Sequence, residues 1–265
     1  LILLSKFTSF PDQGLEIDIA VHVGSILAVM IYFWRDIRDM LYGLVNAFFN
    51  RFPSVKNFYL RKASAAAKDF ILNQLPAADL RLLLMLVVGT VPAVVFGLAL
   101  HHFGMEWLRS TKIIGWNILL FGILLWIADR FQPSKRSIAD MTYKDAFLIG
   151  LAQCLAMIPG TSRSGITITA SRFLRLERRE AARFCMLLSV PAIAGAGLLV
   201  AAEIWQSGNY ENLHYALSGI GYSFIASIAA IFIMMKWLKN YTFLPFVIYR
   251  VVLGIFLLLH SYGYI

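Results

Sequence analysis

A short polar cluster between two apolar segments carries the chemistry of this 265-residue chain. The cluster consists of Pro159, Gly160, Thr161, Ser162, Arg163, Ser164, Gly165, Ile166 and Thr167. The hydroxyls of Ser162 and Ser164, the guanidinium of Arg163 and the free N–H groups of a helix that starts there would converge on one point. Such a combination binds phosphate. We therefore predict that Ser162, Arg163 and Ser164 carry out phosphate chemistry.

The predicted roles differ along the cluster. Arg163 would hold the terminal phosphate of the substrate and stabilise the charge that develops during phosphoryl transfer. The backbone N–H groups of Gly165 and Ile166 would complete the cradle, and Thr167 would add a hydroxyl one turn into the helix. Gly160 and Thr161 would form the phosphate-binding turn. In the alternative interpretation, Arg163 reaches the lipid headgroups and the serines only cap a helix.

The apolar segment before the cluster is too short to cross a membrane. Residues 146–158 favour a helix, but 13 residues of helix rise only about 20 Å, against about 30 Å for a hydrocarbon core. Backbone that leaves a helix at membrane depth is tolerated where protein or a wet cavity surrounds it. The Pro159-Gly160 break therefore predicts a pocket inside the membrane.

Composition places the chain among integral membrane proteins. Hydrophobic residues make up 59% and charged residues 15%, which is far from the average soluble domain. We expect one all-α polytopic membrane domain over residues 1–265. The net charge of +9 lies in loops, which favours anionic lipids as partners and argues against nucleic acid. Cys154 and Cys185 lie in apolar segments and are predicted to be packing residues, without a disulfide.

Six segments are long and apolar enough to be predicted as transmembrane helices. They are 17–34, 82–100, 113–128, 184–202, 219–237 and 243–260. Residues 35–81 are predicted to lie on the membrane surface, with short amphipathic stretches at 40–49 and 63–72. Oligomeric state is left open, a homodimer included.

Basic residues set the expected topology. Eight Lys or Arg in 35–81 and four in 129–145 predict cytoplasmic loops, whereas 203–218 has none and should be external. Both assignments hold only if residues 146–183 enter and leave on one face, as a re-entrant helical hairpin. The second half, 129–265, then reads as a hairpin followed by three spans, and the first half, 1–128, as three spans of inverted topology.

The inverted repeat predicts a further hairpin that is missing from the first half. The chain begins in apolar sequence without Met, so we expect the partner hairpin to lie upstream of Leu1. Inverted repeats place a site where two broken segments meet at the membrane midplane. The incomplete first repeat is therefore expected to leave this site without half of its residues.

Four residues outside the cluster are secondary candidates. Asp18 and His22 lie four apart on one helix face, as an intrahelical pair or as part of the site. Arg250 lies inside the last span, which is costly without a partner or a cavity. Arg178 belongs to a basic run that otherwise favours a solvated, lipid-facing patch. The run comprises Arg172, Arg175, Arg178, Arg179 and Arg183. His101 and His102 are adjacent and point to different helix faces, so a metal role is disfavoured.

The cluster resembles the Pro-Gly-x-Ser-Arg-Ser-Gly motif of the undecaprenyl-diphosphatases, the bacitracin-resistance integral membrane phosphatases. Around the motif, the similarity includes the residues from Gln153 onward. It also includes four further segments of the chain, in the same order as in the family. They are Val23–Val29, Gly89–Ala93, Leu187–Pro191 and Pro245–Arg250. It covers essentially the whole chain. The resemblance implies a fold of six spans with two re-entrant hairpins in the bacterial inner membrane.

The resemblance also implies an activity. Members hydrolyse undecaprenyl diphosphate to the monophosphate and inorganic phosphate, which recycles the carrier lipid for cell-wall synthesis, and they require a divalent cation, Mg²⁺ or Ca²⁺. An arginine is often found in the family at the position of Arg178, which implies a secondary role near the headgroup. A polyprenyl-phosphate flippase or another inverted-repeat transporter is the alternative, because broken helices are typical of carriers too.

One departure from the family pattern matters. The family's glutamate-rich helix and Ser-Ser-Thr-Gly-His motif normally precede a stretch like Leu1–Leu4, and they are absent here. The acidic metal-binding residues and a histidine of the family lie in that motif, so the cation ligands stay unknown. We expect this chain to bind phosphate poorly and to turn over slowly. His22 stands where the family has Gln before Leu-Gly, which leaves its role open.

Overall fold

The computed structural model describes residues 14–69, 71, 80–103, 110–207 and 213–264. Side chains are described for the same residues except 14–19, 66, 100–103, 196–207 and 213–215. Apart from one isolated bridge between Arg136 and Leu176, the regular structure within these ranges is helical. The helices are α2 (Gly14–Tyr32), α3 (Trp34–Arg51), α4 (Pro53–Lys62), α5 (Ala65–Asp69), α6 (Leu80–Phe103), α7 (Thr111–Phe131), η4 (Ile138–Asp140), α8 (Tyr143–Cys154), η5 (Leu155–Met157), α9 (Arg163–Phe173), α10 (Arg178–Ser207), α11 (Leu213–Trp237) and α12 (Leu244–Ser261). The all-α prediction is confirmed.

Four of the described helices are long and apolar enough to cross a membrane. They are Leu80–Ala99, Thr111–Phe131, Ala216–Trp237 and Leu244–Ser261, close to four of the predicted spans. A fifth is added if α2 and α3 count as one broken span. The predicted span 184–202 lies within α10, of which only part has described side chains. The chain is thus a multi-pass membrane protein, and six spans remain a prediction.

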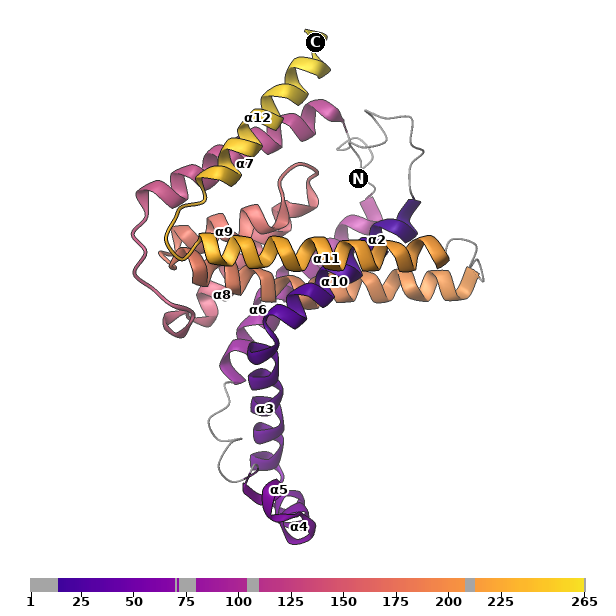
Figure 1. The fold of residues 1–265 in the computed structure, drawn as a ribbon, viewed down its shortest axis with the longest axis vertical. Coiled ribbons are helices and arrows are strands. Elements are labelled where there is room, and N and C mark those ends of the chain that lie inside the picture. Colours follow the sequence, from indigo (N-terminus) through magenta and orange to yellow (C-terminus); the bar gives the residue numbers. More distant parts are fainter. Residues whose placement is uncertain (1–13, 70, 72–79, 104–109, 208–212, 265) are drawn as a thin grey trace.

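The first predicted span ends differently from the prediction. Helix α2 ends at Tyr32, and α3 begins at Trp34 with a bend of 79° between them. Residues 35–51, predicted as the start of a polar segment on the membrane surface, form a continuous helix that includes the predicted amphipathic stretch 40–49, and their position on the membrane surface stays a prediction. Helix α3 leaves the body of the molecule and ends in α4 and α5 (Figure 1). Buried Phe33 at the bend packs into the main core, which holds the break in place.

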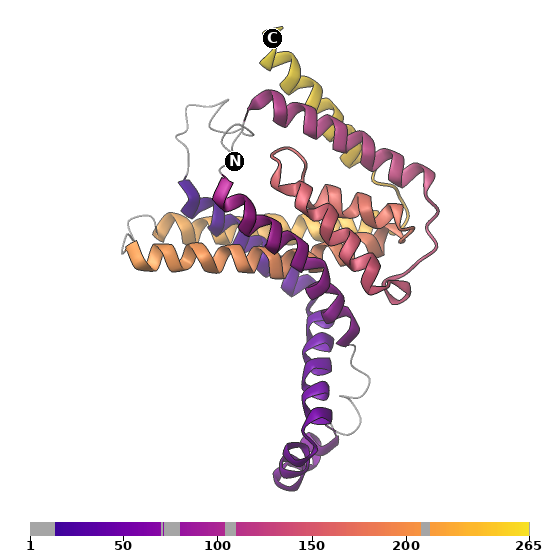
Figure 2. The ribbon, with the colours of Figure 1, turned by 180° about the vertical axis from the view of Figure 1, so that it is seen from behind.

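Glycines allow two pairs of predicted spans to cross closely. Helix α2 packs against α11, where a Cβ on Gly24 would lie 2.3 Å from the Ile220 carbonyl oxygen. Helix α7 packs against α12, where Gly254 lies against Leu119 and Gly122 against Arg250. Small residues at such crossings are typical of membrane helices, because close backbone approach replaces the hydrophobic effect there. The α7 and α12 pair stands together at one side of the molecule in both views (Figures 1 and 2).

Helices α8 and α9 form a hairpin whose two ends meet. Lys135 and Arg136 donate backbone N–H bonds to the Arg175 carbonyl (3.2 and 3.1 Å), and Glu177 returns one to the Arg136 carbonyl (2.8 Å). The polypeptide between these residues therefore folds back on itself, as the prediction for 146–183 required. Helix α8 packs on α6, where a Cβ on Gly150 would lie 2.1 Å from the Gly89 carbonyl oxygen.

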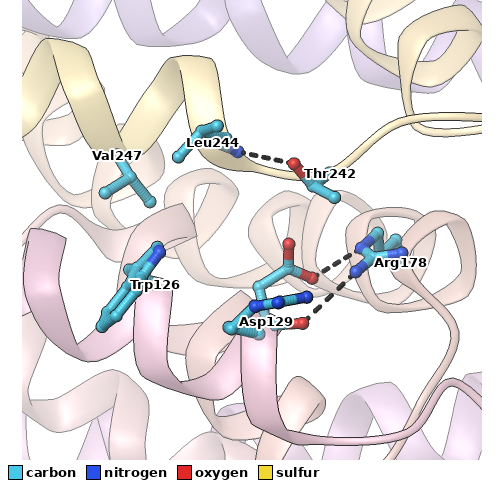
Figure 3. A pocket seen from close by; sticks show the side chains of 7 residues that line it. Trp126, Asp129, Arg178, Thr242, Leu244 and Val247 are labelled. Atoms are coloured by element: carbon cyan, nitrogen blue, oxygen red, sulfur yellow. Dashed lines mark hydrogen bonds and ion pairs between the residues drawn. The ribbon is translucent and has the colours of Figure 1, made fainter.

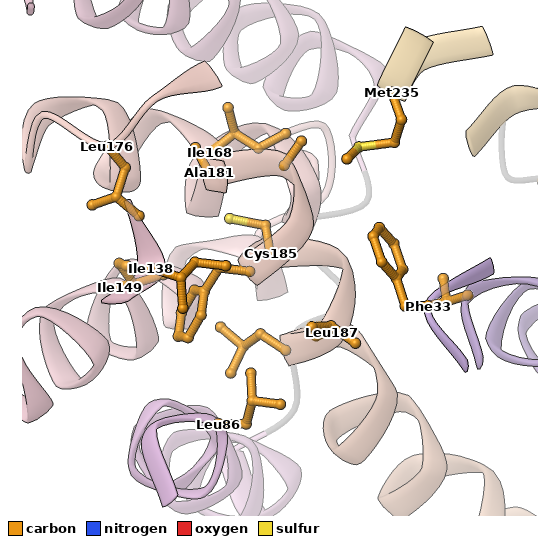
Figure 4. Packing of buried hydrophobic residues seen from close by; sticks show 14 of the residues in the cluster. Phe33, Leu86, Ile138, Ile149, Ile168, Leu176, Ala181, Cys185, Leu187 and Met235 are labelled. Atoms are coloured by element: carbon orange, nitrogen blue, oxygen red, sulfur yellow. The ribbon is translucent and has the colours of Figure 1, made fainter. Parts of the chain in front are cut away.

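The hydrophobic core surrounds this hairpin. One cluster of buried residues draws on nearly every long helix and includes Ile149 of α8, Ile168 of α9 and Leu187 of α10 (Figure 4). Phe184, Ile149 and Leu188 are fully buried. Cys185 belongs to the cluster, and both cysteines are free and buried. The prediction that Cys154 and Cys185 are packing residues is confirmed.

Candidate functional site

The polar cluster forms the tip of the hairpin between α8 and α9. Gly160 has φ of +90°, and a Cβ at this position would lie 2.5 Å from the Ile114 carbonyl oxygen of α7. Ser162 has φ of 66°, a conformation that is costly for a residue other than glycine and is concentrated at functional sites. The Asn117 side chain of α7 donates to the Pro159 carbonyl (3.0 Å). The tip is therefore held in one conformation against α7.

Ser162 caps the start of α9 and thereby uses two of the predicted phosphate donors. Its Oγ accepts the Gly165 N–H (3.2 Å), and its carbonyl accepts the Ile166 N–H (3.0 Å). The N–H groups of Arg163 and Ser164, in the first turn, have no acceptor within the helix. The available backbone donors thus lie two residues earlier than the sequence analysis placed them.

Arg163 turns inward from the tip rather than out to solvent. Its Nε donates to Gln153 Oε1 of α8 (3.2 Å), and Nη2 donates to the Leu188 carbonyl of α10 (3.4 Å). Within the described residues it forms no ion pair with a carboxylate. The alternative interpretation, in which Arg163 reaches the lipid headgroups, does not fit this geometry. An inward guanidinium with only neutral acceptors is prepared to exchange them for an anion.

Arg250 of α12 is a second cation at the tip. Its Nη2 donates to the carbonyl oxygens of Gly160 (3.1 Å) and Thr161 (2.9 Å), and its side chain is buried. Its Nη1 lies 3.1 Å from the place where a Cβ on Gly165 would be. The structure therefore brings Arg250 to the predicted cluster, as a residue that ties α12 to the turn before α9. No ion pair is formed by this guanidinium in the part of the chain that is described.

Three buried polar atoms at the tip have no hydrogen-bond partner. They are Gln153 Nε2, Thr161 Oγ1 and Arg250 Nε, and they are the complete set of such side-chain atoms among the described residues. Buried polar groups normally find partners, so orphaned ones need an explanation. All three are able to donate, as a phosphate requires. Their gathering beside Arg163 marks the tip as the candidate site.

Thr167 is buried one turn into α9, and its hydroxyl is already used. Its Oγ1 donates to the carbonyl oxygens of Arg163 (2.9 Å) and Ser164 (3.3 Å). The next hydroxyl along this face, Ser171, donates to the Thr167 carbonyl (2.8 Å) and contacts the Cys185 thiol (3.4 Å). Thr167 would have to rotate away from the helix before it could donate to a phosphate.

Residues 1–256 match the family model described as bacitracin resistance protein BacA. The chain belongs to this family. The undecaprenyl-diphosphatase of Roseobacter denitrificans is 40% identical over 264 residues, covering 99% of this chain and 90% of the relative. That of Ruegeria pomeroyi is 40% identical with the same coverage. Undecaprenyl-diphosphatase 1 of Rhodospirillum rubrum is 41% identical over 256 residues, covering 96% and 82%. The family resemblance is thereby confirmed.

At the opposite end of α9 the BacA-family hairpin rests on a buried ionic network that the sequence analysis missed. Asp129, at the end of α7, accepts from Arg172 Nε (3.1 Å) and Arg178 Nε (2.7 Å) through one oxygen and from the Phe243 N–H (3.1 Å) through the other. Figure 3 shows Asp129 with Arg178. Arg172 also donates to the Gln132 carbonyl (2.8 Å). An acidic residue at the end of an apolar helix, opposite a basic run, was the available signal.

The prediction of a solvated patch was therefore wrong for Arg172 and Arg183, and Arg178, the secondary candidate in this run, is paired as well. Arg172 is fully buried, and Arg178 pairs with Asp129. Arg183 pairs with Asp36 of α3 and with Glu180. Only Arg175 and Arg179 are exposed. Fold-back of the hairpin brings carboxylates of α7 and α3 to these side chains, which periodicity within the run could not reveal.

A second polar network closes the base of the hairpin. Arg136 pairs with Asp145 (2.6 Å) and donates to the Leu174 carbonyl (3.0 Å). Burial raises the pKa of Asp145, but the Arg136 and Thr142 hydrogen bonds outweigh this effect and leave the pKa below its usual value. Hydrogen bonds from Ser137 lower the pKa of Asp140. Both carboxylates are thus ionised at neutral pH, and Asp145 holds Arg136, which joins the two hairpin ends through its bond to the Leu174 carbonyl.

The other secondary candidates lie away from the tip. Arg178 is at the far end of α9, which is about 16 Å long at 1.5 Å per residue. His22 is exposed on α2, which packs mainly against α11 and α10. Asp18 belongs to α2, but its side chain lies outside the described residues. Of the secondary candidates, Arg250 is therefore the one that the described contacts bring to the hairpin tip.

A divalent cation does not fit the described residues by themselves. Among them, no three His, Cys, Asp or Glu side chains lie close enough together to hold a metal ion. Asp129 is already shared by two arginines and a backbone N–H. The tip presents donors and cations rather than carboxylate oxygens, the ligands that Mg²⁺ and Ca²⁺ prefer. Ligands for a cation would have to come from outside the described set.

Proposed function

We propose that this chain is an undecaprenyl-diphosphatase of the bacterial inner membrane. It would hydrolyse the lipid diphosphate to the monophosphate and inorganic phosphate, the activity that the names of its relatives carry. One observation in the structure carries the proposal. Arg163 and Arg250, neither paired with a carboxylate in the described part of the chain, converge with three unpartnered polar atoms at the start of α9.

The tip offers a phosphate more donors than the protein itself uses. Arg163 would exchange Gln153 Oε1 and the Leu188 carbonyl for two phosphate oxygens, in the bidentate geometry that guanidinium groups favour. The N–H groups of Arg163 and Ser164 would add the dipole of α9. Ser162 can donate its hydroxyl proton to phosphate while its Oγ still accepts the Gly165 N–H.

Arg250 and Thr161 complete the proposed cradle. Arg250 keeps the Gly160 and Thr161 carbonyls turned away from the phosphate, since a carbonyl oxygen facing an anion would repel it. Its unpartnered Nε and the unpartnered Thr161 hydroxyl remain as further donors. Two guanidinium charges would stabilise the negative charge that spreads over the transferred phosphoryl group.

The divalent cation implied by the resemblance belongs to the proposal as well. When bound, such an ion neutralises phosphate charge and lowers the pKa of a coordinated water. The residues at the described tip would hold the phosphate rather than the ion. Release of phosphate in the presence and absence of a chelator checks this expectation. A homodimer also stays a prediction, which the mass of the detergent-solubilised protein would check.

Helix contacts support the proposed inverted repeat. Take α2, α6 and α7 as the spans of residues 1–128 and α10, α11 and α12 as those of 129–265. The first span of each half packs on the second span of the other half, because α2 contacts α11 and α10 contacts α6. The third spans of the two halves, α7 and α12, pack on each other. A two-fold relation between the halves produces such a pattern. The α8–α9 hairpin would then be a re-entrant element of the second half.

Phosphate release from undecaprenyl diphosphate in detergent tests the function. Arg163→Lys keeps the charge and removes the guanidinium fork, so we expect kcat to fall about 100-fold, as for loss of one oriented donor to a developing oxyanion. Arg61→Lys on exposed α4 is the matched control and should leave the rate unchanged. An Arg163→Lys rate within twofold of the unmodified protein would refute the assignment.

A carrier is the rival function that the repeat would also suit. Vesicles that contain the protein and labelled lipid diphosphate separate the two. Phosphate release without transfer of the lipid between leaflets supports the hydrolase. Transfer without phosphate release supports the carrier and contradicts our proposal.

A further inference from the structure

A cavity lies at the opposite end of α9 from the tip. It has a volume of about 250 Å³ and lies between the end of α7 and the start of α12 (Figure 3). Its lining consists of Trp126, Asp129, Arg130, Arg178, Thr242, Leu244 and Val247. None of these residues belongs to the proposed phosphatase site, so this cavity needs its own explanation.

The cavity continues into an apolar groove. A neighbouring hollow of about 360 Å³ shares Trp126, Leu244 and Val247 with it and follows the surface between α7 and α12. The remaining lining of this hollow, Ile123, Ile248, Val251 and Val252, is apolar. One ligand could therefore place a polar end in the first hollow and a hydrocarbon chain along the second.

The polar end of this path is positively charged. Arg172 and Arg178 share the single carboxylate of Asp129, and Arg130 forms no hydrogen bond or ion pair within the described chain. Three guanidinium groups around one carboxylate leave two positive charges. Asp129 already accepts three hydrogen bonds, so this cavity offers no free carboxylate to the ammonium group of a zwitterionic lipid. The adjoining hollow holds Arg179 and Lys239 with Glu177 and is also net positive.

The path lies at the depth of lipid headgroups. Arg130 is in the last turn of the candidate span Thr111–Phe131, and Leu244 begins the candidate span Leu244–Ser261. Trp126 lines both hollows, and Trp is enriched at membrane–water interfaces. The charged end therefore faces the headgroup region, while the groove runs toward the hydrocarbon core.

We propose that this surface binds an anionic glycerophospholipid. Its phosphate would contact Arg130 and Nη1 of Arg178, because Nε and Nη2 of Arg178 donate to Asp129. One acyl chain would lie in the groove between α7 and α12. A bound lipid would connect the Asp129 network to α12, the helix that carries Arg250. The site takes a lipid of the surrounding leaflet and is separate from the substrate site by the length of α9.

Contact quenching of Trp126 tests this proposal. The full chain is placed in phosphatidylcholine bilayers that contain increasing fractions of phosphatidylglycerol or phosphatidylcholine with brominated acyl chains. Subtracting the signal of Trp126→Phe isolates Trp126 from the other five tryptophans. We expect the brominated anionic lipid to quench Trp126 at a several-fold lower fraction than the brominated zwitterionic lipid.

Charge variants locate the headgroup. Arg130→Gln should weaken the preference for phosphatidylglycerol about fivefold, the effect of removing one cation near a membrane surface. Arg61→Gln removes the same charge from α4 and should not change the preference. Equal quenching by both lipids, or equal effects of the two variants, would overturn the proposal.

Two further measurements complete the test. Inorganic phosphate should not abolish the preference, and if it does, the cavity binds soluble phosphate rather than lipid and the proposal fails. Arg130→Gln should still release phosphate from undecaprenyl diphosphate in detergent at the unmodified rate. Loss of lipid preference with retained hydrolysis in Arg130→Gln supports the lipid site. If the lipid site is refuted, the proposed phosphatase site is not affected, because the two are tested by different measurements.

Discussion

At the scale of residues, the chemistry depends on arginines that differ in what surrounds them. Arg163 and Arg250 have neutral acceptors at the hairpin tip, whereas Arg172 and Arg178 share a buried carboxylate at its base. A guanidinium with only neutral acceptors in a buried place attracts an anion, and one paired with a carboxylate stabilises structure. The hydrogen-bond partners of each arginine therefore decide whether it is expected to bind an anion or to stabilise the fold.

The structural group leads to a prediction for Asp129. Asp129→Asn should destabilise the protein by about 3–5 kcal/mol, because the fully buried Arg172 would keep its charge without a counter-ion. Unfolding in detergent, followed by circular dichroism, measures the change. Asp39→Asn breaks an exposed pair with Arg38 and should cost less than about 1 kcal/mol. Equal losses in the two variants would show that the Asp129 network is not a structural centre.

Arg250 is predicted to affect both stability and rate. Arg250→Met removes the charged bonds to the Gly160 and Thr161 carbonyls, so stability should fall by about 1.5–3 kcal/mol, the usual contribution of a hydrogen bond to a charged group. Phosphate release should fall as well, because the turn before α9 loses its support. If Arg163 binds phosphate, Arg163→Lys should lower the rate without lowering stability. If Arg250 positions the turn, Arg250→Met should lower both the rate and the stability. Unchanged stability in Arg250→Met would contradict this role.

At the scale of elements, the hairpin reaches its position through close backbone contact. Helix α8 can approach α6 only because Gly150 and Gly89 have no side chains at the crossing. The turn at Gly160 likewise fits beneath Ile114 of α7 only without a Cβ. The geometry of the tip therefore depends on residues that carry no chemistry themselves.

Gly150→Ala tests this dependence. The new Cβ would lie 2.1 Å from the Gly89 carbonyl oxygen, so α8 must shift, and we expect a loss of about 1–3 kcal/mol. Gly221→Ala on α11 is the control, because nothing lies within 4 Å of its Cβ, and alanine favours helix. Thermal unfolding in detergent compares the two. Equal midpoints would mean that α8 and α6 do not pack as described.

At the scale of the whole molecule, the position of the hairpin ends leads to a prediction of how the chain lies in a membrane. Backbone bonds join residues 135–136 to 175–177, so the polypeptide that leaves α7 and the one that enters α10 start from the same place. The charge pattern independently assigns both to the cytoplasmic face. Together they predict that α8 and α9 enter the membrane and return without crossing it.

Accessibility of single cysteines tests the topology. In a background with Cys154→Ala and Cys185→Ala, Ser134→Cys and Arg179→Cys should react with an impermeant maleimide from the same side of sealed vesicles. Ser207→Cys, in the predicted external loop 203–218, should react from the other side. Labelling of Ser134→Cys and Arg179→Cys from opposite sides would mean that the hairpin spans the bilayer.

The sequence by itself determined the membrane class, the positions of four spans, the fold-back of residues 146–183 and the polar cluster at Arg163. These features follow from composition, segment length and local residue types, all of which are local along the chain. The tertiary structure decided which arginines meet a carboxylate, that Arg250 supports the tip, and that Ser162 uses the N–H groups of Gly165 and Ile166. Asp129 joins Arg172 across 43 residues of sequence, and only the packing of α7, α9 and α12 brings such partners together.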